Sequence, residues 1–162
     1  MSGLRHGPAL VLGDDVNTDV LHPSRFYSLD DTTVRSGFLG AVEGREDAAK
    51  ADLGGRIVVA GTNFGIGSSR ETGARVFLLA GIQAVVAVSF ARIFHRNVLN
   101  LGLPALACPA LAEVTVQEGD EVSLDLSTGA LTVAGRTLQT EGLDPHWQQV
   151  LEAGGLAPWL GL

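Results

Sequence analysis

The chain has 162 residues, of which 46% are hydrophobic and 18% charged, a composition typical of soluble globular proteins, and we expect residues 1–162 to form one domain. The formal net charge of −7 argues against a nucleic-acid partner. The longest apolar region, residues 76–94, is interrupted by glycine and polar residues, so it predicts two buried elements and no membrane span. Cys108 is the single cysteine, which excludes an internal disulfide. The N-terminus lacks the apolar core of a signal peptide. Together with the single cysteine, this favours a cytoplasmic protein.

The first half of the chain contains two candidate strands and one clear helix. Residues 9–12 form a short apolar strand, and residues 13–19 are rich in side chains that bond their own backbone in turns. Residues 30–52 are polar and predict loops with short helices. The apolar run at 57–60 predicts a buried strand, and the helical pattern at 74–80 ends at a glycine.

The second half predicts another strand and helix, followed by a different architecture. Residues 84–88 are apolar on both faces, as in a parallel sheet, and residues 90–101 predict a helix. Residues 121–133 alternate polar and apolar around a turn and predict a hairpin. A last helix, 145–153, begins after Asp144, which can cap it. The fold class is therefore α/β: a mostly parallel core sheet flanked by helices, with an additional antiparallel β-hairpin.

The most informative segment is residues 61–71, Gly-Thr-Asn-Phe-Gly-Ile-Gly-Ser-Ser-Arg-Glu, between a predicted strand and a predicted helix. Its glycines allow a ligand to approach the backbone, and a helix N-terminus favours anions. Ser68 and Ser69 offer hydroxyl groups, and Arg70 offers a planar fork suited to a carboxylate. From the loop alone, an equally good interpretation is a structural turn in which Ser68 or Ser69 caps the helix, with Glu71 completing a capping box after Ser68.

Two phosphate- and acyl-transfer motifs do not fit this loop. A Walker loop needs a lysine before its serine, and the chain's one lysine, Lys50, lies elsewhere. A nucleophile elbow needs a glycine at the position of Arg70. A small anionic substrate therefore fits the loop better than a nucleotide.

Long stretches of the chain resemble the swivelling domain of the aconitase superfamily, and most closely the small subunits of isopropylmalate isomerase and homoaconitase. Residues 63–71 match the family's N-F-G-x-G-S-S-R-E loop, and residues 81–103 match its G-I-x-A-V-I-A-x-S-F-A-R-I-F-x-R-N-x-x-N-x-G-L segment. Residues 14–19 match a D-x-x-N-T-D turn that precedes a proline, here Pro23. The resemblance covers nearly the whole chain and implies a swivelling β/β/α domain.

The resemblance also implies a chemistry and a partner. In this family a separate large subunit carries a [4Fe-4S] cluster on its own cysteines, so no metal or cofactor is expected on this chain. The small di- or tricarboxylate substrate is dehydrated and then rehydrated at the neighbouring carbon. Ser68 matches the serine that removes the proton, and Ser69 and Arg70 match ligands of a substrate carboxylate. The assembly is expected to be a heterodimer or heterotetramer.

Several further residues are expected to support or shape the site. In relatives, the segment after the early proline contacts the distal part of the substrate, and Arg25 is the positive charge in the matching segment here. The apolar neighbours of Arg25 favour the isopropyl group of isopropylmalate over the distal carboxylate of homocitrate. We expect hydrogen bonds to support the serine loop, while a self-contained turn at residues 17–19 is an equal alternative. The expected supporting residues are Asn17, Thr18, Asp19, Asn63, Gly65 and Gly67.

The chain departs from the family immediately after the loop. Relatives continue S-S-R-E-H-A-P, whereas this chain has Thr72 and Gly73 after Glu71. Gly73 in a first helical turn is expected to loosen it. The leading hypothesis is the small subunit of 3-isopropylmalate dehydratase; homoaconitate hydratase or another alkylmalate dehydratase is the alternative within the family. A non-catalytic carboxylate-binding or regulatory module is the alternative outside it.

Overall fold

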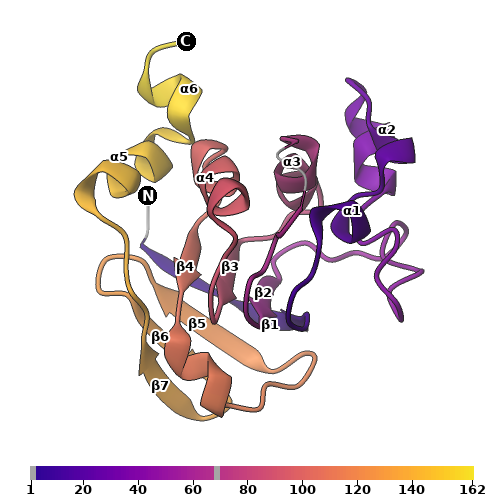
Figure 1. Cartoon of the computed structure of the whole chain (residues 1–162). Helices are drawn as coiled ribbons and strands as arrows, with labels where there is room; N and C mark the ends of the chain where they lie inside the picture. Colours follow the sequence, from indigo (N-terminus) through magenta and orange to yellow (C-terminus); the bar gives the residue numbers. More distant parts are fainter. Residues whose placement is uncertain (1–2, 68–69) are drawn as a thin grey trace.

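A computed structural model describes residues 3–67 and 70–162. One seven-stranded sheet runs through it in the order β4-β3-β2-β1-β5-β6-β7. Figure 1 shows the helices α1 to α6 gathered on one side of the parallel strands, with strands β5 to β7 curled below them. The strands are β1 Leu4–Val11, β2 Ile57–Ala60, β3 Ala84–Ala87, β4 Ala105–Ala107, β5 Glu121–Asp125, β6 Ala130–Val133 and β7 Arg136–Gln139.

The helices sit mostly between the parallel strands in sequence. Strands β2, β3 and β4 are joined by α3 and α4, while α1, η1 and α2 lie in the long connection from β1 to β2. The α-helices are α1 Thr18–Leu21, α2 Asp31–Ser36, α3 Thr72–Leu79, α4 Arg92–Asn100, α5 Pro145–Ala153 and α6 Leu156–Trp159. The 3-10 helices are η1 Ser24–Phe26 and η2 Pro109–Glu113.

Strand β1 joins a parallel and an antiparallel half of the sheet. Its last residues, 9–11, pair in parallel with β2, while residues 4–8 pair antiparallel with β5. The expected strand at 9–12 therefore begins five residues earlier, because β5 supplies a partner far away in sequence. The predicted hairpin of β5 and β6 is confirmed and gains a third strand, β7.

Two hydrophobic clusters divide the molecule into three layers. One face of the parallel strands, including Leu10, Val58 and Val85, packs against the helices. The other face, including Ile57 and Val86, packs against the inner side of β5 to β7. Alternate residues of each strand point to opposite faces, and both faces here are apolar, as they must be in a covered sheet. The expected β/β/α arrangement is confirmed.

The predicted element types are right, and the predicted cap of α5 is confirmed. Strand β2 and helix α5 have the expected bounds, and the Asp144 side chain accepts a hydrogen bond from the Trp147 backbone N–H at 3.0 Å. Helix α3 begins at Thr72, with Glu71 at the cap position and no side-chain cap bond. The helix thus starts two residues before the predicted pattern at 74–80, and the two residues predicted to cap it, Ser68 and Ser69, lie outside the described residues. Among the described residues, no helix is long and apolar enough to cross a lipid bilayer.

Candidate active site at the carboxyl ends of the parallel strands

Three loops leave the carboxyl ends of neighbouring parallel strands and lie together. They are residues 12–17 after β1, residues 61–67 after β2, and residues 88–91 after β3. In open α/β sheets, ligands bind at this edge. The middle loop is the glycine-rich segment singled out in the sequence, so the fold places it between two neighbours that can hold it.

The loop after β1 is hydrogen-bonded along the length of the middle loop. The Asp14 carboxylate accepts from the Thr62 backbone N–H at 2.7 Å, and the Asp15 carboxylate accepts from the Asn63 side-chain amide at 3.2 Å. Backbone bonds continue the pairing: Gly65 N–H donates to the Val16 carbonyl at 2.9 Å. Further along, Thr18 N–H donates to the Ile66 carbonyl at 2.7 Å.

Residues 17–19 form a local turn and also bond to the middle loop through their backbone. The Asn17 side chain accepts from the Asp19 backbone N–H at 2.8 Å, which is a local turn that caps α1. The contact to the middle loop comes from the backbone of Thr18, through the bond to Ile66. The described contact of Asp19 in this network is its N–H bond to Asn17.

The loop after β3 holds the middle loop from the other side. The Ser89 hydroxyl accepts from the Asn63 backbone N–H at 2.9 Å, and the Ser89 carbonyl accepts from Phe64 N–H at 3.0 Å. Phe64 itself is fully buried, with Phe94 at 5.4 Å and Phe77 at 6.2 Å between ring centroids, both edge to face. Aromatic packing of this kind adds to hydrophobic burial. The loop is thus anchored both by backbone bonds and by a core side chain.

Two glycines of the middle loop are required by their surroundings. Gly65 has φ of 89°, and a Cβ there would overlap the Phe94 ring. Gly67 has φ of 109°, and a Cβ there would meet the Asn17 side-chain amide at 2.5 Å. Both φ values lie in the region that favours glycine. The sequence predicted that glycines of this loop let a ligand approach the backbone, but beside these two glycines the space is filled by Phe94 and Asn17.

The proposed catalytic serine Ser68 and its neighbour Ser69 lie outside the described residues. The chain resumes at Arg70, which is exposed, with its guanidinium carbon 4.8 Å from the centroid of the Tyr27 ring. Such a distance is within the range of a cation–π contact. Arg70 stands two residues before α3, at the positive end of that helix. The loop and the segment of residues 23–30 therefore meet at Arg70 and Tyr27.

Arg25, the other expected substrate ligand, is placed differently from Arg70. Its guanidinium carbon lies 4.6 Å from the ring centroid of its neighbour Phe26, and both belong to η1. Phe26 in turn packs so closely on Gly37 that a Cβ at that glycine would overlap its ring. The described contact between this segment and the glycine-rich loop comes from Tyr27 and not from Arg25.

Arg75 of α3 fastens the 23–30 segment to the helix. One guanidinium nitrogen donates to the Ser28 carbonyl at 3.0 Å, and another lies 4.0 Å from the Asp31 carboxylate. The Nε atom of Arg75 is buried and has no hydrogen-bond partner. This clamp is made of side chains, unlike the backbone pairing of the middle loop.

His22 is a buried polar residue under the same segment. It is fully buried, its Nε2 lies 2.9 Å from the Val34 carbonyl, and its ring stacks on Tyr27 with centroids 5.7 Å apart. Burial lowers the pKa of His22, the bond to the Val34 carbonyl opposes this, and the nearby charge of Arg75 lowers it further. A carbonyl accepts only, so a neutral His22 carries its proton on Nε2.

The sequence motifs contained some of these residues without showing their roles. Asp14, Asp15 and Ser89 lie inside matched motifs, but only the fold shows that they bond to the middle loop. Tyr27 was expected only as one of the apolar neighbours of Arg25, and Arg75 was not expected to take part; the structure places Tyr27 against Arg70 and bonds Arg75 to Ser28. An aromatic residue in the segment expected to contact the substrate was the available signal for the contact of Tyr27 with an arginine.

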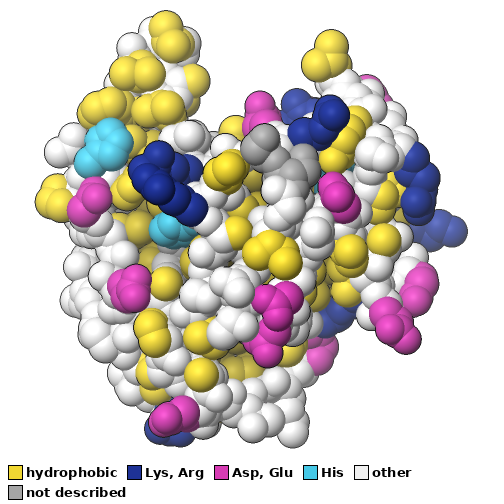
Figure 2. Space-filling view, viewed as in Figure 1, with side chains coloured by type: hydrophobic (Ala, Val, Ile, Leu, Met, Phe, Trp, Pro, Cys, Tyr) yellow, Lys and Arg dark blue, Asp and Glu magenta, His cyan; other side chains and the backbone are white. Residues whose placement is uncertain are grey.

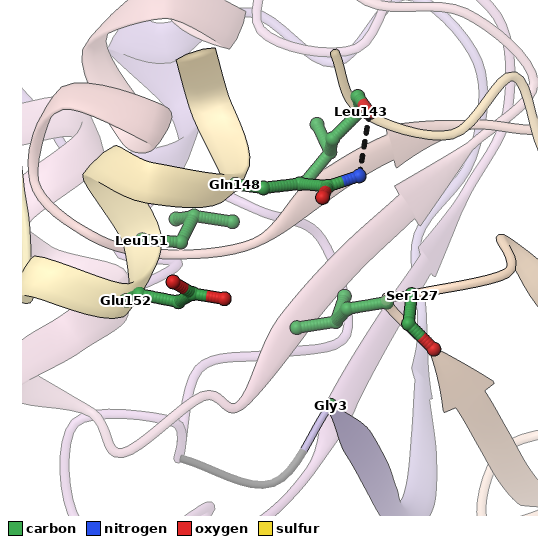
Figure 3. A pocket seen from close by; sticks show the side chains of 7 residues that line it. Gly3, Ser127, Leu143, Gln148, Leu151 and Glu152 are labelled. Carbon is green, nitrogen blue, oxygen red and sulfur yellow. Dashed lines mark hydrogen bonds between the residues drawn. The ribbon is translucent and has the colours of Figure 1, made fainter. Parts of the chain in front are cut away.

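One cavity lies beside the loop after β3, and another lies away from all three loops. A cavity of about 430 Å³ is lined by Ser89 and Phe90 of the β3 loop, together with His95 and Glu141. His95 is half-buried here, stacked on Phe90 with centroids 4.7 Å apart. A second cavity, of about 200 Å³, lies between α5 and the end of β5 (Figure 3), and none of its lining residues belongs to the three loops.

Charge and metal-ligating groups bear on what the site can hold. Figure 2 shows Lys and Arg side chains both over α4 and on the α1 to α3 side of the molecule, with Asp and Glu side chains between them, in a chain that is acidic as a whole. Across residues 3–67 and 70–162, no group of three His, Cys, Asp or Glu side chains is arranged to hold a metal ion. Cys108 is buried, and burial raises the pKa of its thiol.

Comparison with known proteins decides the family. The model of the aconitase C-terminal domain matches residues 29–111. The chain belongs to the aconitase C-terminal domain family. Within it, the chain is 39% identical to the 3-isopropylmalate dehydratase small subunit of Metallosphaera sedula, over 95% of this chain and 94% of that protein. It is 38% identical to the isopropylmalate/citramalate isomerase small subunit of Methanocaldococcus jannaschii, over 99% and 95%.

A solved structure from this aconitase C-terminal domain family agrees with the fold. The crystal structure of 3-isopropylmalate dehydratase from Methanocaldococcus jannaschii superposes with a TM-score of 0.88 and 34% identity. The match covers 98% of this chain and 93% of that chain. The resemblance first seen in the glycine-rich loop and the segment at 81–103 is thus confirmed over almost the full length.

Proposed function

We propose that the chain is the small subunit of a hydro-lyase that isomerises 3-isopropylmalate by dehydration and rehydration. The observation that carries this proposal is the middle loop, which holds the Asn-Phe-Gly-Ile-Gly part of the family signature between two neighbouring loops, with Arg70 three residues beyond Gly67 in the sequence. Relatives named 3-isopropylmalate dehydratase small subunit, 36–40% identical over nearly the whole chain, support the substrate and the reaction.

The roles proposed for this chain follow from its own groups. Ser68 removes the proton next to a substrate carboxylate. A serine is a poor base in water, so the positive end of α3 and the charge of Arg70 must stabilise its alkoxide. Ser69 and Arg70 bind the carboxylate, which fixes the reacting carbon next to Ser68. Arg25 is proposed to contribute positive charge at the rim of the site.

The remaining chemistry is proposed to come from a partner. The names of the relatives describe small subunits, which implies a large one. We propose that this large subunit carries a [4Fe-4S] cluster, which supplies Lewis-acid activation of the leaving hydroxyl group when present. Nothing in this chain has to bind the cluster. The isolated small subunit is therefore expected to be inactive.

The experiment that tests the function is reconstitution with the matching large subunit. The mixed, cluster-loaded complex is expected to interconvert 2- and 3-isopropylmalate, whereas neither subunit does so alone. Citramalate and homocitrate are the comparison substrates, since one relative is named for both isopropylmalate and citramalate. A complex that forms and carries the cluster, yet turns over none of the three acids, contradicts the proposal and favours a binding or regulatory module.

A further inference from the structure

Three side chains lie in layers beside the glycine-rich loop. The guanidinium of Arg70 lies over the ring of Tyr27 at 4.8 Å, and the ring of Tyr27 stacks on that of His22 at 5.7 Å with planes 28° apart. Arg70 is exposed, Tyr27 is half-buried and His22 is fully buried. The layers therefore run from the core to the surface and connect residues from two segments that are far apart in sequence.

The upper contact suits an arginine that has to bind a carboxylate. A guanidinium that lies flat on an aromatic ring keeps its N–H groups, which lie in the plane of the fork, for hydrogen bonds. An aromatic ring also holds the positive charge without competing for it, unlike an aspartate or glutamate partner. Tyr27 can therefore orient Arg70 while the N–H groups of the Arg70 guanidinium donate to the two oxygens of a carboxylate.

The lower contact fixes the aromatic ring in turn. His22 is held by the Val34 carbonyl at 2.9 Å, and helix α2, to which Val34 belongs, is tied to α3 by the Asp31 to Arg75 contact. Arg75 also donates to the Ser28 carbonyl, one residue beyond Tyr27. The Tyr27 ring is thus bounded by a buried ring below and a clamped backbone beside it, so its position is set by the core.

We propose that Tyr27 and His22 are positioning residues that hold the Arg70 guanidinium in the orientation needed to bind a substrate carboxylate. This inference rests on the proposed function and adds to it the groups that orient the carboxylate ligand. Tyr27 touches Arg70 directly, and His22 acts through Tyr27.

The test is steady-state kinetics of the reconstituted complex with 3-isopropylmalate. Tyr27→Leu is expected to raise KM by about 2- to 30-fold, the range of one cation–π contact, with a smaller change in kcat. Tyr27→Phe keeps the ring face and is expected to restore KM to within about twofold of the original value. His22→Ala is expected to shift KM in the same direction as Tyr27→Leu and by less, because its effect is indirect.

A double-mutant cycle separates positioning of Arg70 from general loosening of the segment. When Arg70→Gln is already present, Tyr27→Leu should have little further effect on KM, since the residue it orients is gone. Trp159→Leu, which removes a half-exposed aromatic side chain from α6, is the matched control and should leave KM unchanged. Melting curves of each small subunit identify any variant that fails to fold.

The outcomes distinguish this inference from the function on which it rests. An active unmodified complex in which Tyr27→Leu and Arg70→Gln raise KM independently overturns the positioning role and leaves the function intact. An unmodified complex without activity overturns the function, and the inference with it. A raised KM that Tyr27→Phe rescues and that vanishes in the Arg70→Gln background supports the inference.

Discussion

The two segments that meet at Arg70 are held by different physics. The middle loop, residues 61–67, is paired through its backbone with the loops on both sides and is anchored by the buried Phe64. Residues 23–30 are held mainly by side chains, through the stacked His22 and the Arg75 clamp. Backbone pairing fixes the path of a loop largely independently of its side chains, apart from the glycines that its turns require, whereas side-chain contacts depend on particular residues. The structure thus separates a loop whose shape is set by its backbone from a segment whose position depends on its side chains.

The largest expected effect breaks the tight loop directly. Gly65→Ala forces a Cβ into the Phe94 ring at a φ of 89°, and we expect it to lower the free energy of unfolding by about 2–5 kcal/mol. Gly119→Ala is the matched control, because Gly119 has a similar φ of 85° with nothing within 4 Å, and it should cost only about 1–2 kcal/mol. Urea unfolding measures both, and equal losses would contradict the close packing of the loop.

A milder change removes one bond between the paired loops. Asp14→Ala leaves the Thr62 N–H without its carboxylate acceptor, and we expect a loss of about 1 kcal/mol in stability together with a lower kcat. Asp14→Asn keeps an oxygen acceptor at the same place and should retain most of both. If the two variants behave alike in unfolding and kinetics, the bond does not hold the loop.

The side-chain-held segment should respond to pH through His22. An unfolded His22 takes up a proton near its ordinary pKa of 6.5, whereas in the folded chain burial and the charge of Arg75 lower that pKa. Between these two values the unfolded state binds more protons, so stability decreases as pH falls, by at most about 1.4 kcal/mol per pH unit from this group.

The variant His22→Gln lacks this contribution. Its free energy of unfolding should therefore fall less steeply than that of the unmodified chain as pH decreases from 7.5 to 5.5. Urea unfolding at several pH values gives both slopes. Parallel slopes would show that His22 takes up its proton equally in the folded and unfolded states.

The smallest expected effect concerns the first turn of α3, where the chain departs from its relatives. Gly73 is buried, and a Cβ there would meet Thr18 at an ordinary 3.6 Å. Gly73→Ala is therefore expected to raise the free energy of unfolding by about 0.5–1 kcal/mol, since alanine favours the helix. A decrease in stability would mean that the turn needs glycine for a reason other than space.

The same contrast explains how far the sequence could lead. Local patterns predicted β2, the cap of α5 by Asp144, and the glycine-rich loop, because each depends on neighbouring residues. They missed the contacts of Asp14, Ser89 and Tyr27, because these bonds join segments that are far apart in sequence. They also missed β7, whose residues, Arg-Thr-Leu-Gln, are mostly polar and become a strand only by pairing with β6.

The site assignments depended on resemblance more than on pattern. The helical pattern at 74–80 predicted α3 to within two residues of its observed start at Thr72. Whether the two serines cap this helix or take part in catalysis could not be decided from the pattern. Their proposed roles come from the family motif, and their positions lie outside the described residues.

The central claim is that this chain supplies the base of a split active site, and Ser68→Ala tests it most directly. In the reconstituted, cluster-loaded complex we expect kcat for 3-isopropylmalate to fall by about 10²–10⁴-fold, the usual contribution of a positioned acid–base group. Size-exclusion chromatography should show that the Ser68→Ala variant assembles with the large subunit as the unmodified chain does. Full turnover by a correctly assembled Ser68→Ala complex would contradict the account.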